Sequence, residues 1–282
     1  MFLNIFTALI IFFASLLGGS NSSTLEFIVK QEIPILEEAL SADKAAVFSD
    51  SDRVFLYLKN EDDAQAIASI TKLMTAIVFL ETKPNFDNVY KIVAADQIEG
   101  GKINLFLGDE LTLKNLFLTS LVASDNGATI ALVRASGLSE PDFIALMNAR
   151  ALELGLVKTK FSDPIGLSEK NVSSAREVII LFKEALKYKE IVEAISLPEY
   201  RFETLQGREK LIESTDQYLL TEGDKDLITL GGKTGYTQEA GYCFVGAFID
   251  TKGNTYYATV LNSINRYSRF TESKNLIYSL KK

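Results

Sequence analysis

The sequence contains no histidine among its 282 residues. This absence excludes catalysis by Ser-His-Asp or Cys-His groups, and it excludes every metal site that relies on histidine. A serine nucleophile in this chain must therefore use another base, and lysine is the leading candidate. Cysteine is almost absent as well, because Cys243 is the only one and has no partner for a disulfide within the chain. Since Cys243 lies in an apolar run, we predict that it is a small core residue.

The chain also lacks a cluster of lysine and arginine, and its net charge is −8. Phosphate binding needs a basic face, so no nucleic-acid partner is expected. Hydrophobic residues make up 47% of the sequence and charged residues 23%, which is the balance of a globular protein. A chain of 282 residues has room for one large domain or two small ones, with an ample core.

An apolar run occupies residues 2–19 and is followed by a stretch rich in serine and asparagine. We predict that residues 1–23 are a signal peptide or a signal anchor, which places the rest of the chain outside the cytoplasmic membrane. No Lys or Arg precedes the run and the cleavage site is loose, so the cleaved and uncleaved forms both remain open. A membrane contact is expected only through this segment, if it stays uncleaved. No cysteine directly follows the run, which argues against a lipoprotein.

Residues 66–81 carry the first chemical signal. Apolar residues recur there with a helical period, and Ser69 is a good N-cap residue, so the spacing predicts a helix with one buried face. Lys72 follows one turn later on the same face. A neutral lysine could remove the serine proton, and a helix start favours negative charge beside it. The simpler interpretation is that Ser69 caps a core helix and Lys72 faces water, since about one Ser-x-x-Lys match arises by chance in such a chain.

Two further motifs favour the chemical interpretation. Ser124-Asp125-Asn126 forms a predicted polar turn between two helices, although such residues at turns usually satisfy local backbone groups. Lys233-Thr234-Gly235 lies on a predicted strand among other glycines. The alternative there is a surface strand with a solvated lysine, but glycines inside a strand often let a second backbone or a ligand approach closely.

Predicted strands lie at both ends of the chain and predicted helices lie between them. The strands are expected at residues 45–48, 53–58, 227–236, 241–250 and 255–261, with hairpin turns after the first and fourth. Helices are expected at residues 66–81, 111–123, 128–135, 141–154, 174–186 and 271–280. This order predicts an α+β fold, in which an antiparallel sheet from residues of about 40–60 and 227–282 carries a helical insertion over about 66–195.

The ordered set Ser-x-x-Lys, Ser-Asp-Asn and Lys-Thr-Gly occurs in penicillin-binding proteins and class A β-lactamases. The chain resembles the serine D-Ala-D-Ala carboxypeptidases, which are low-molecular-weight penicillin-binding proteins. The likeness extends from about residue 45 to the C-terminus and is densest at residues 68–76 and 231–243, with shorter matches at 106–109, 124–128, 163–167 and 269–273. It implies a β-lactamase/DD-peptidase-like fold, with an antiparallel sheet flanked by helices and an all-helical subdomain, and a catalytic domain over residues 24–282.

The resemblance implies a serine mechanism that needs no metal or organic cofactor. Ser69 would attack the carbonyl of the penultimate D-Ala of a peptidoglycan stem peptide and form an acyl-enzyme, while Lys72 takes its proton. Ser124 would bridge Lys72 and the leaving nitrogen. The backbone N–H groups of Ser69 and Tyr236 would form the oxyanion hole. β-Lactams would then act as covalent inhibitors.

The resemblance also implies the substrate contacts. Asn126 would hold the substrate's amide, and Lys233 and Thr234 would bind its terminal carboxylate. Gly235 belongs to the same binding strand, and Arg269 would assist with the carboxylate.

Three other functions remain open from the sequence. A D,D-endopeptidase would use the same residues, and it is favoured because the chain ends where the catalytic domain should end, whereas many relatives carry a further β-rich domain and a membrane-binding tail. A class A β-lactamase needs a Glu-x-x-x-Asn loop, which the sequence lacks between Asn126 and Lys233. A non-catalytic wall-binding protein would not need its motifs intact.

The loop at residues 161–171 departs from the family pattern. Related chains often have Asn-Pro-His-Gly-Leu where this one has Asp163-Pro164-Ile165-Gly166-Leu167. The missing histidine leaves any auxiliary role of the loop open. Asp163 and Glu169 do not follow the β-lactamase pattern, and we expect Ile165 and Leu167 to pack as apolar filler.

Overall fold

The computed structural model describes residues 40–98 and 100–281. The predicted signal segment at residues 1–23 lies outside these residues. Within the described ranges, no helix has the length and apolar character needed to cross a membrane.

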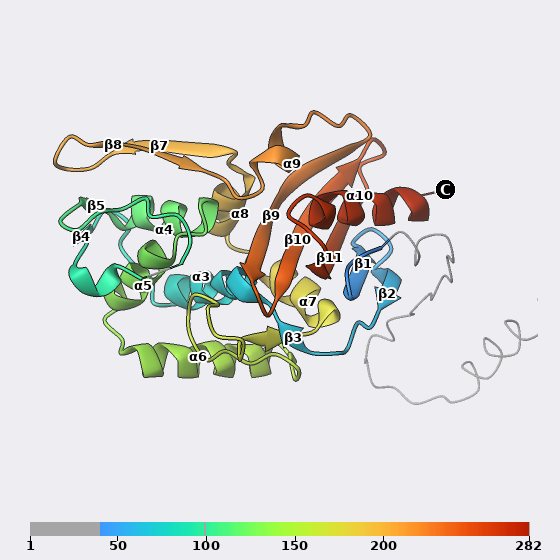
Figure 1. Cartoon of the computed structure of the whole chain (residues 1–282), viewed down its shortest axis with the longest axis horizontal. Helices are drawn as coiled ribbons and strands as arrows, with labels where there is room; N and C mark the ends of the chain where they lie inside the picture. The colour runs from blue at the N-terminus through green and yellow to red at the C-terminus, as the bar shows by residue number, and fades with distance from the viewer. Residues whose placement is uncertain (1–39, 99, 282) are drawn as a thin grey trace, which may run out of the picture.

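One half of the molecule is a five-stranded antiparallel sheet in the order β2-β1-β11-β10-β9 (Figure 1). Its strands are β1 (Lys44–Ser49), β2 (Val54–Lys59), β9 (Leu227–Thr237), β10 (Gly241–Asp250) and β11 (Thr255–Ser263). The two predicted hairpins, β1–β2 and β10–β11, are confirmed, and the sheet joins the two ends of the chain. β9 is the edge strand that lies next to the helical half.

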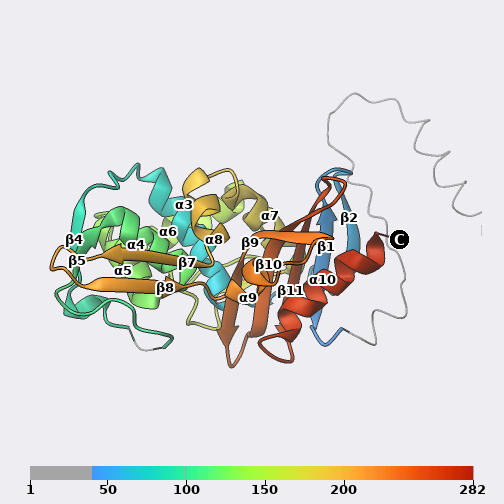
Figure 2. The same ribbon diagram turned by 90° about the horizontal axis from the view of Figure 1, so that it is seen from above.

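The two faces of the sheet are covered by different helices. Ala45 and Val47 of β1 pack with the C-terminal helix α10 (Ser268–Leu280), whereas Ala46 and Phe48 belong to the core that contains α7 (Ala175–Ala185). The alternation follows from the two-residue period of a strand, because successive side chains point to opposite faces. Figure 2 shows α10 lying along one face of the sheet. Cys243 is fully buried, as predicted.

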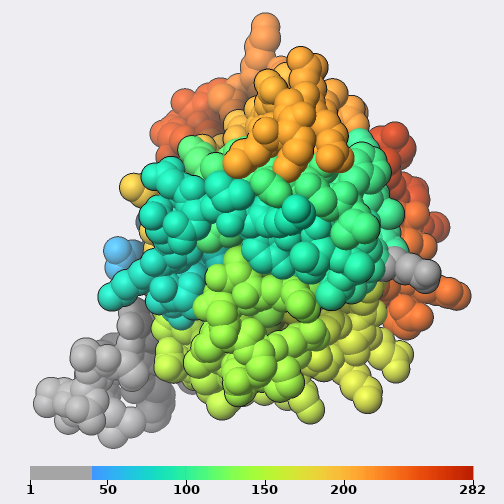
Figure 3. Space-filling model, turned by 90° about the vertical axis from the view of Figure 1, so that its left-hand side faces the viewer, coloured from blue at the N-terminus to red at the C-terminus, as the bar shows by residue number. Residues whose placement is uncertain are grey.

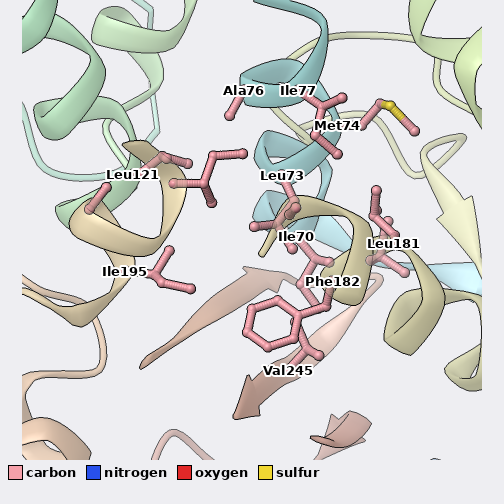
Figure 4. Close-up of a cluster of buried hydrophobic side chains, with 14 of the residues drawn as sticks. Ile70, Leu73, Met74, Ala76, Ile77, Leu121, Leu181, Phe182, Ile195 and Val245 are labelled. Atoms are coloured by element: carbon pink, nitrogen blue, oxygen red, sulfur yellow. The ribbon is translucent and has the colours of Figure 1, made fainter. Parts of the chain in front are cut away.

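The helical half surrounds α3 (Lys72–Glu81), whose residues from Lys72 to Phe79 are all buried. Figure 4 shows Leu73 and Met74 among apolar side chains from several elements, including Leu121, Leu181 and Val245. The other helices of this half are α4 (Leu113–Val122), α5 (Asn126–Ala135), α6 (Glu140–Glu153) and α8 (Lys189–Ser196). A helix enclosed in this way is a rigid support for the residues at its ends.

The predicted role of Ser69 as a helix N-cap is wrong. Ser69 lies inside a short 3-10 turn, η1 (Ala68–Thr71), and α3 begins only at Lys72. The turn starts at Ala68, whose φ of 47° is in the left-handed region, so the chain cannot enter a regular helix there. By contrast, Ser174 does cap its helix, α7, because its side chain accepts a hydrogen bond from the backbone N–H of Glu177.

Several short elements were not predicted. Most prominent is the hairpin of β7 (Glu199–Glu203) and β8 (Glu209–Glu213), which lies across the helical half (Figure 3). It is fastened there by Asp109, a buried carboxylate that pairs with Arg208 and Lys210 at 2.7 Å each. The remaining elements are β3 (Gln65–Ala66), β4 (Val89–Lys91), η2 (Ala94–Asp96), β5 (Glu110–Thr112), β6 (Val172–Ser173) and α9 (Gln217–Thr221).

Candidate active site

The three sequence motifs meet in one cleft between the edge strand β9 and the helical half. Ser69 comes from η1, Ser124 and Asn126 from the turn that leads into α5, and Thr234 and Gly235 from β9. The cleft has a volume of about 870 Å³ and is also lined by Tyr236 and Arg269. Residues far apart in the sequence are therefore brought together, as the family resemblance implied.

Lys72 is fully buried behind Ser69 and holds it directly. Its Nζ donates hydrogen bonds to Ser69 Oγ at 2.9 Å, to Asn126 Oδ1 at 2.8 Å and to the Ile165 carbonyl oxygen at 2.7 Å. Burial lowers the pKa of Lys72 from 10.5 to about 7, although the charges of Asp125 and Asp163 favour the protonated form. The amine can therefore be neutral near pH 7, at hydrogen-bond distance from a serine hydroxyl. The solvent-facing alternative for Lys72 is wrong.

Two glycines let other segments approach the backbone of the nucleophile. A Cβ on Gly235 would lie 2.6 Å from the Ile67 carbonyl oxygen, and one on Gly166 would lie 2.1 Å from that of Ala68. Both sites are also within 3.3 Å of the Ser69 backbone nitrogen. Since a Cβ does not tolerate contacts this short, only glycine fits at either place. The close approach brings the backbone of β9 against the turn that carries Ser69.

Ser124 is held facing the cleft by an unusual backbone. Its φ of 57° is in the left-handed region, and the next residue, Asp125, caps α5 by accepting a hydrogen bond from the Ala128 N–H at 2.8 Å. Ser124 Oγ accepts a hydrogen bond from Lys233 Nζ at 2.8 Å. The resemblance implied a contact with Lys72, but the structure pairs Ser124 with Lys233. Ser124 is thus next to the reacting centre with the other lysine as its partner.

Asn126 is hydrogen-bonded at both ends of its side chain. Its Oδ1 accepts from Lys72, and its Nδ2 donates to the Gly100 carbonyl oxygen at 2.8 Å. Both polar ends of the side chain are therefore engaged within the protein, where they hold Lys72 in place. A contact of Asn126 with the substrate's amide stays a prediction.

One wall of the cleft carries the groups expected to bind a carboxylate. Lys233 Nζ lies between Ser124 Oγ and the Thr234 carbonyl oxygen, and Thr234 Oγ1 donates to Thr215 Oγ1 at 2.6 Å. The Arg269 guanidinium donates to the Gly235 carbonyl oxygen at 3.2 Å. Burial, and next the charge of Lys72, hold the pKa of Lys233 well below its usual value. Burial lowers the pKa of Arg269 to about 10, so Arg269 still gives this wall a positive charge near pH 7, and Lys233 adds a second one when it is protonated.

The aromatic ring of Tyr236 stands at the mouth of the cleft. It is 55% exposed and stacks on Tyr242, with the ring centroids 4.3 Å apart. The predicted use of Tyr236 concerns only its backbone N–H, and this use stays a prediction. No prediction from the sequence concerns the exposed ring of Tyr236.

The loop at residues 161–171 contributes a carbonyl group rather than a side chain. Asp163 organises it by accepting hydrogen bonds from the backbone N–H groups of Ile165, Gly166 and Ser168. This places the Ile165 carbonyl on Lys72, so the contact does not depend on a histidine at this position. Ile165 is buried, as expected, but Leu167 is 42% exposed and lines the cleft, so its predicted role as filler is wrong.

No metal centre accompanies these residues within the described ranges: they contain no group of three or more His, Cys, Asp or Glu side chains that could hold an ion. The site therefore consists of the Ser69 hydroxyl, hydrogen-bonded to the buried amine of Lys72, and the neighbouring wall that carries Lys233 and Arg269.

The chain matches the family described as D-alanyl-D-alanine carboxypeptidase over residues 30–264. The chain belongs to that family. The expected family, α+β fold and serine hydrolase class are therefore confirmed. The site described above is that of a family member with its three motifs intact.

The curated relatives of this carboxypeptidase family member include both activities considered above. It is 34% identical over 237 residues to the D-alanyl-D-alanine carboxypeptidase DacF of Bacillus subtilis, which covers 80% of this chain and 58% of that protein. It is 36% identical over 220 residues to the D-alanyl-D-alanine endopeptidase of Haemophilus influenzae, which covers 76% of this chain and 73% of that protein. The chain thus spans little more than half of the Bacillus relative and most of the Haemophilus one.

Solved structures give the same family fold. Penicillin-binding protein D2 of Listeria monocytogenes, in its cefotaxime-bound form, has a TM-score of 0.74 and 30% identity, and the match covers 86% of this chain and 98% of that one. The Streptomyces K15 DD-transpeptidase has a TM-score of 0.79 and 25% identity, covering 86% and 97%. Both matches confirm the predicted DD-peptidase-like architecture.

The buried lysines of this family member predict a bell-shaped pH dependence. With Lys72 as the predicted base, its pKa of about 7 makes the acylation rate fall about tenfold per pH unit well below neutrality. The predicted binding role of Lys233 requires its charged form, so its lowered pKa makes the alkaline decline begin before the usual lysine range. The second-order rate of penicillin acylation, measured against pH, checks both limbs. An acid limb centred near the usual carboxylate range would show that Lys72 is not the base.

Proposed function

We propose that this protein is a serine-type D-Ala-D-Ala carboxypeptidase that removes the terminal D-Ala from peptidoglycan stem peptides through an acyl-enzyme on Ser69, with residues 24–282 as its catalytic domain. The observation that carries the proposal is the hydrogen bond of 2.9 Å between Ser69 Oγ and the buried Nζ of Lys72, whose pKa of about 7 suits a base. Ser124 also lines the cleft beside a buried lysine, Lys233, but Ser69 is the serine that precedes its lysine by three residues in the Ser-x-x-Lys motif.

The acylation step follows from these positions. Ser69 Oγ attacks the carbonyl carbon of the penultimate D-Ala while its proton passes to Lys72 Nζ. The oxyanion is stabilised by the N–H groups of Ser69 and Tyr236, each such donor contributing about 2.7–4 kcal/mol in the transition state. The close contact of β9 with the nucleophile turn supports this pairing of donors. Lys233, Thr234 and Arg269 bind the terminal carboxylate.

Collapse of the tetrahedral intermediate breaks the peptide bond. The leaving nitrogen needs a proton, and Ser124 Oγ is placed to give it one while it takes another from Lys233 Nζ at 2.8 Å. The route through Lys233, in place of one directly from Lys72, is what the observed hydrogen bond supports. D-Ala then leaves. Proton exchange with solvent removes the proton that Lys72 took from Ser69 and returns one to Lys233, so both lysines recover their starting forms. A water molecule then attacks the ester carbonyl while neutral Lys72 takes its proton, and Lys72 passes that proton to Ser69 Oγ as the ester bond breaks, which regenerates Ser69.

A D,D-endopeptidase that cuts peptide cross-links is the second candidate. The 36% identity to the Haemophilus endopeptidase, over 73% of that protein, is the observation that favours it. Both reactions use the same acyl-enzyme and differ only in the amine that leaves. Purified protein assayed on a pentapeptide ending in D-Ala-D-Ala and on a cross-linked dimer separates them. We expect faster release of D-Ala from the pentapeptide, and faster cleavage of the dimer would reverse the assignment.

The deacylating carboxylate of a β-lactamase has no counterpart in the loop at residues 161–171. Both oxygens of Asp163 accept backbone N–H groups, and the side chain of Glu169 is exposed. Neither carboxylate is available to activate a water on Ser69. Slow release of a β-lactam, which would then act as a covalent inhibitor, is the expected behaviour.

We also propose that the enzyme works outside the cytoplasmic membrane, where peptidoglycan is found. The support is the apolar run at residues 2–19, which has the character of an export signal or anchor. A reporter enzyme fused after Ser23, of a type active only outside the membrane, should be active. Activity confined to a cytoplasmic reporter at the same position would contradict the proposed location.

A further inference from the structure

A buried carboxylate lies behind the cationic wall and has no part in the steps above. Asp216 precedes α9 and is 2% exposed. Its Oδ1 accepts a hydrogen bond from Ser214 Oγ, whereas its Oδ2 has no hydrogen-bond partner among the described residues. A buried carboxylate oxygen without a partner is costly, so a charge nearby must compensate it for the group to stay ionised.

The charges of two cations of the wall act on this carboxylate. Asp216 interacts electrostatically with Lys233 of β9 and with Arg269 of α10, both of which are buried. The residue before it, Thr215, accepts the hydrogen bond from Thr234 at 2.6 Å. The segment that carries Asp216 therefore meets the carboxylate-binding groups through a hydrogen bond and through charge.

The two lysines of the site have opposite requirements. Lys72 must be neutral to act as a base, while Lys233 must be charged to bind a carboxylate, and their charges repel each other in a buried place. The carboxylates near Lys72 are Asp125 and Asp163, and both already accept backbone N–H groups that offset their charge. Asp216 is the carboxylate that favours the charged form of Lys233. The negative charge near Lys72 is thus offset by backbone N–H groups, whereas the negative charge of Asp216 near Lys233 is not offset to the same extent.

We propose that Asp216 is a positioning residue for carboxylate recognition, whose negative charge keeps the proton of the lysine pair on Lys233 and so leaves Lys72 neutral. The inference rests on the proposed function, because it assigns Lys233 to the substrate's terminal carboxylate. Asp216 itself is buried behind the wall and acts only through Lys233.

The test compares two substrates that differ only at the terminus. One peptide ends in D-Ala-D-Ala with a free carboxylate, and the other ends in the corresponding amide. With Asp216→Asn, which removes the charge but keeps the size, kcat/KM for the carboxylate peptide is expected to fall about tenfold, mainly through KM. Any effect on Lys72 as base is common to both substrates, so it cancels from the ratio of their kcat/KM values, and this ratio is expected to fall about tenfold.

A matched control removes a carboxylate outside the cleft. Asp224 forms an ion pair with Lys274 and a hydrogen bond with Tyr278, so Asp224→Asn should leave the ratio between the two peptides unchanged. An unchanged ratio between the two peptides in folded Asp216→Asn would show that its charge has no part in carboxylate recognition and would overturn the inference.

The pH dependence of wild-type enzyme tests the inference without a variant. Burial raises the pKa of the Asp216 carboxyl to about 6, so its charge is lost as the pH falls below that value. The substrate carboxylate titrates near 3.5 and stays charged. The ratio of kcat/KM for the carboxylate and amide peptides should therefore fall as the pH drops through about 6, whereas the protonation of Lys72 cancels from it.

The outcomes separate this inference from the proposed function. A ratio that falls with pH in wild type, and that is low and independent of pH in Asp216→Asn, supports it. A ratio constant with pH in wild type overturns it even if the variant does not fold. If wild type releases D-Ala from neither peptide, the proposed function fails first and this inference fails with it.

Discussion

Replacing Ser69 with alanine is expected to abolish covalent labelling by penicillin and release of D-Ala. Among the serines at residues 40–98 and 100–281, Ser69 alone combines an opening to the cleft with a hydrogen bond to the buried Lys72. Loss of a serine nucleophile typically costs about 10⁶-fold in kcat, which is beyond the range of a labelling assay. The measurement is the amount of labelled penicillin bound to each protein after denaturation.

The variant should fold normally, because Ser69 is only half-buried and the change leaves a small side chain in the turn. Ser120→Ala is a matched control, since Ser120 is a buried serine on α4 that bonds to Thr129 and does not line the cleft. Labelling of a folded Ser69→Ala protein at the wild-type level would refute the assignment of the nucleophile.

The two lysines are expected to respond differently to arginine. Arginine stays protonated at any working pH and cannot take a proton, so Lys72→Arg should slow acylation by about 10³-fold or more. Lys233→Arg keeps the positive charge that the carboxylate needs and should retain much more activity, with a loss of about tenfold because its site is tight. Acylation rates of both variants with the same penicillin measure the difference.

The ratio of the two acylation rates is a better test than either rate alone. Both lysines are buried and both variants introduce the same larger side chain, so steric damage should affect the two variants similarly. Circular dichroism and thermal unfolding of the two proteins control for damage to the fold. Equal losses in two folded variants would mean that the division into base and carboxylate ligand is wrong.

The identity of the site residues could be predicted from the sequence because they are side chains in motifs. Ser69, Lys72, Ser124 and Lys233 lie together as expected, whereas the edge position of the strand that carries Lys233 was not predicted. The sheet could also be predicted, since alternating apolar residues and short turns are local signals.

The partners of those residues could not be predicted in the same way. The Ile165 carbonyl on Lys72 has no side-chain signature, and the pairing of Ser124 with Lys233 depends on how two distant segments meet. Ser69 was expected at a helix cap because serine favours caps, but the left-handed Ala68 places it in a 3-10 turn instead. Nothing in the sequence singles out Asp216. Its proposed role depends on an oxygen without a hydrogen-bond partner among the described residues and on the charges of Lys233 and Arg269, and both features arise only from tertiary packing.

We propose that the site is complete for acylation but has no carboxylate that would speed deacylation. A peptide substrate releases D-Ala and leaves room for water, whereas the amine of an opened β-lactam stays tethered to the acyl group and blocks that approach. Intact-protein mass spectrometry after mixing with penicillin tests this most directly. We expect the protein to gain the mass of one drug molecule, located on the peptide that contains Ser69 and persisting for many minutes. Rapid return to the unmodified mass, with penicillin consumed in large excess over protein, would contradict it and indicate a β-lactamase.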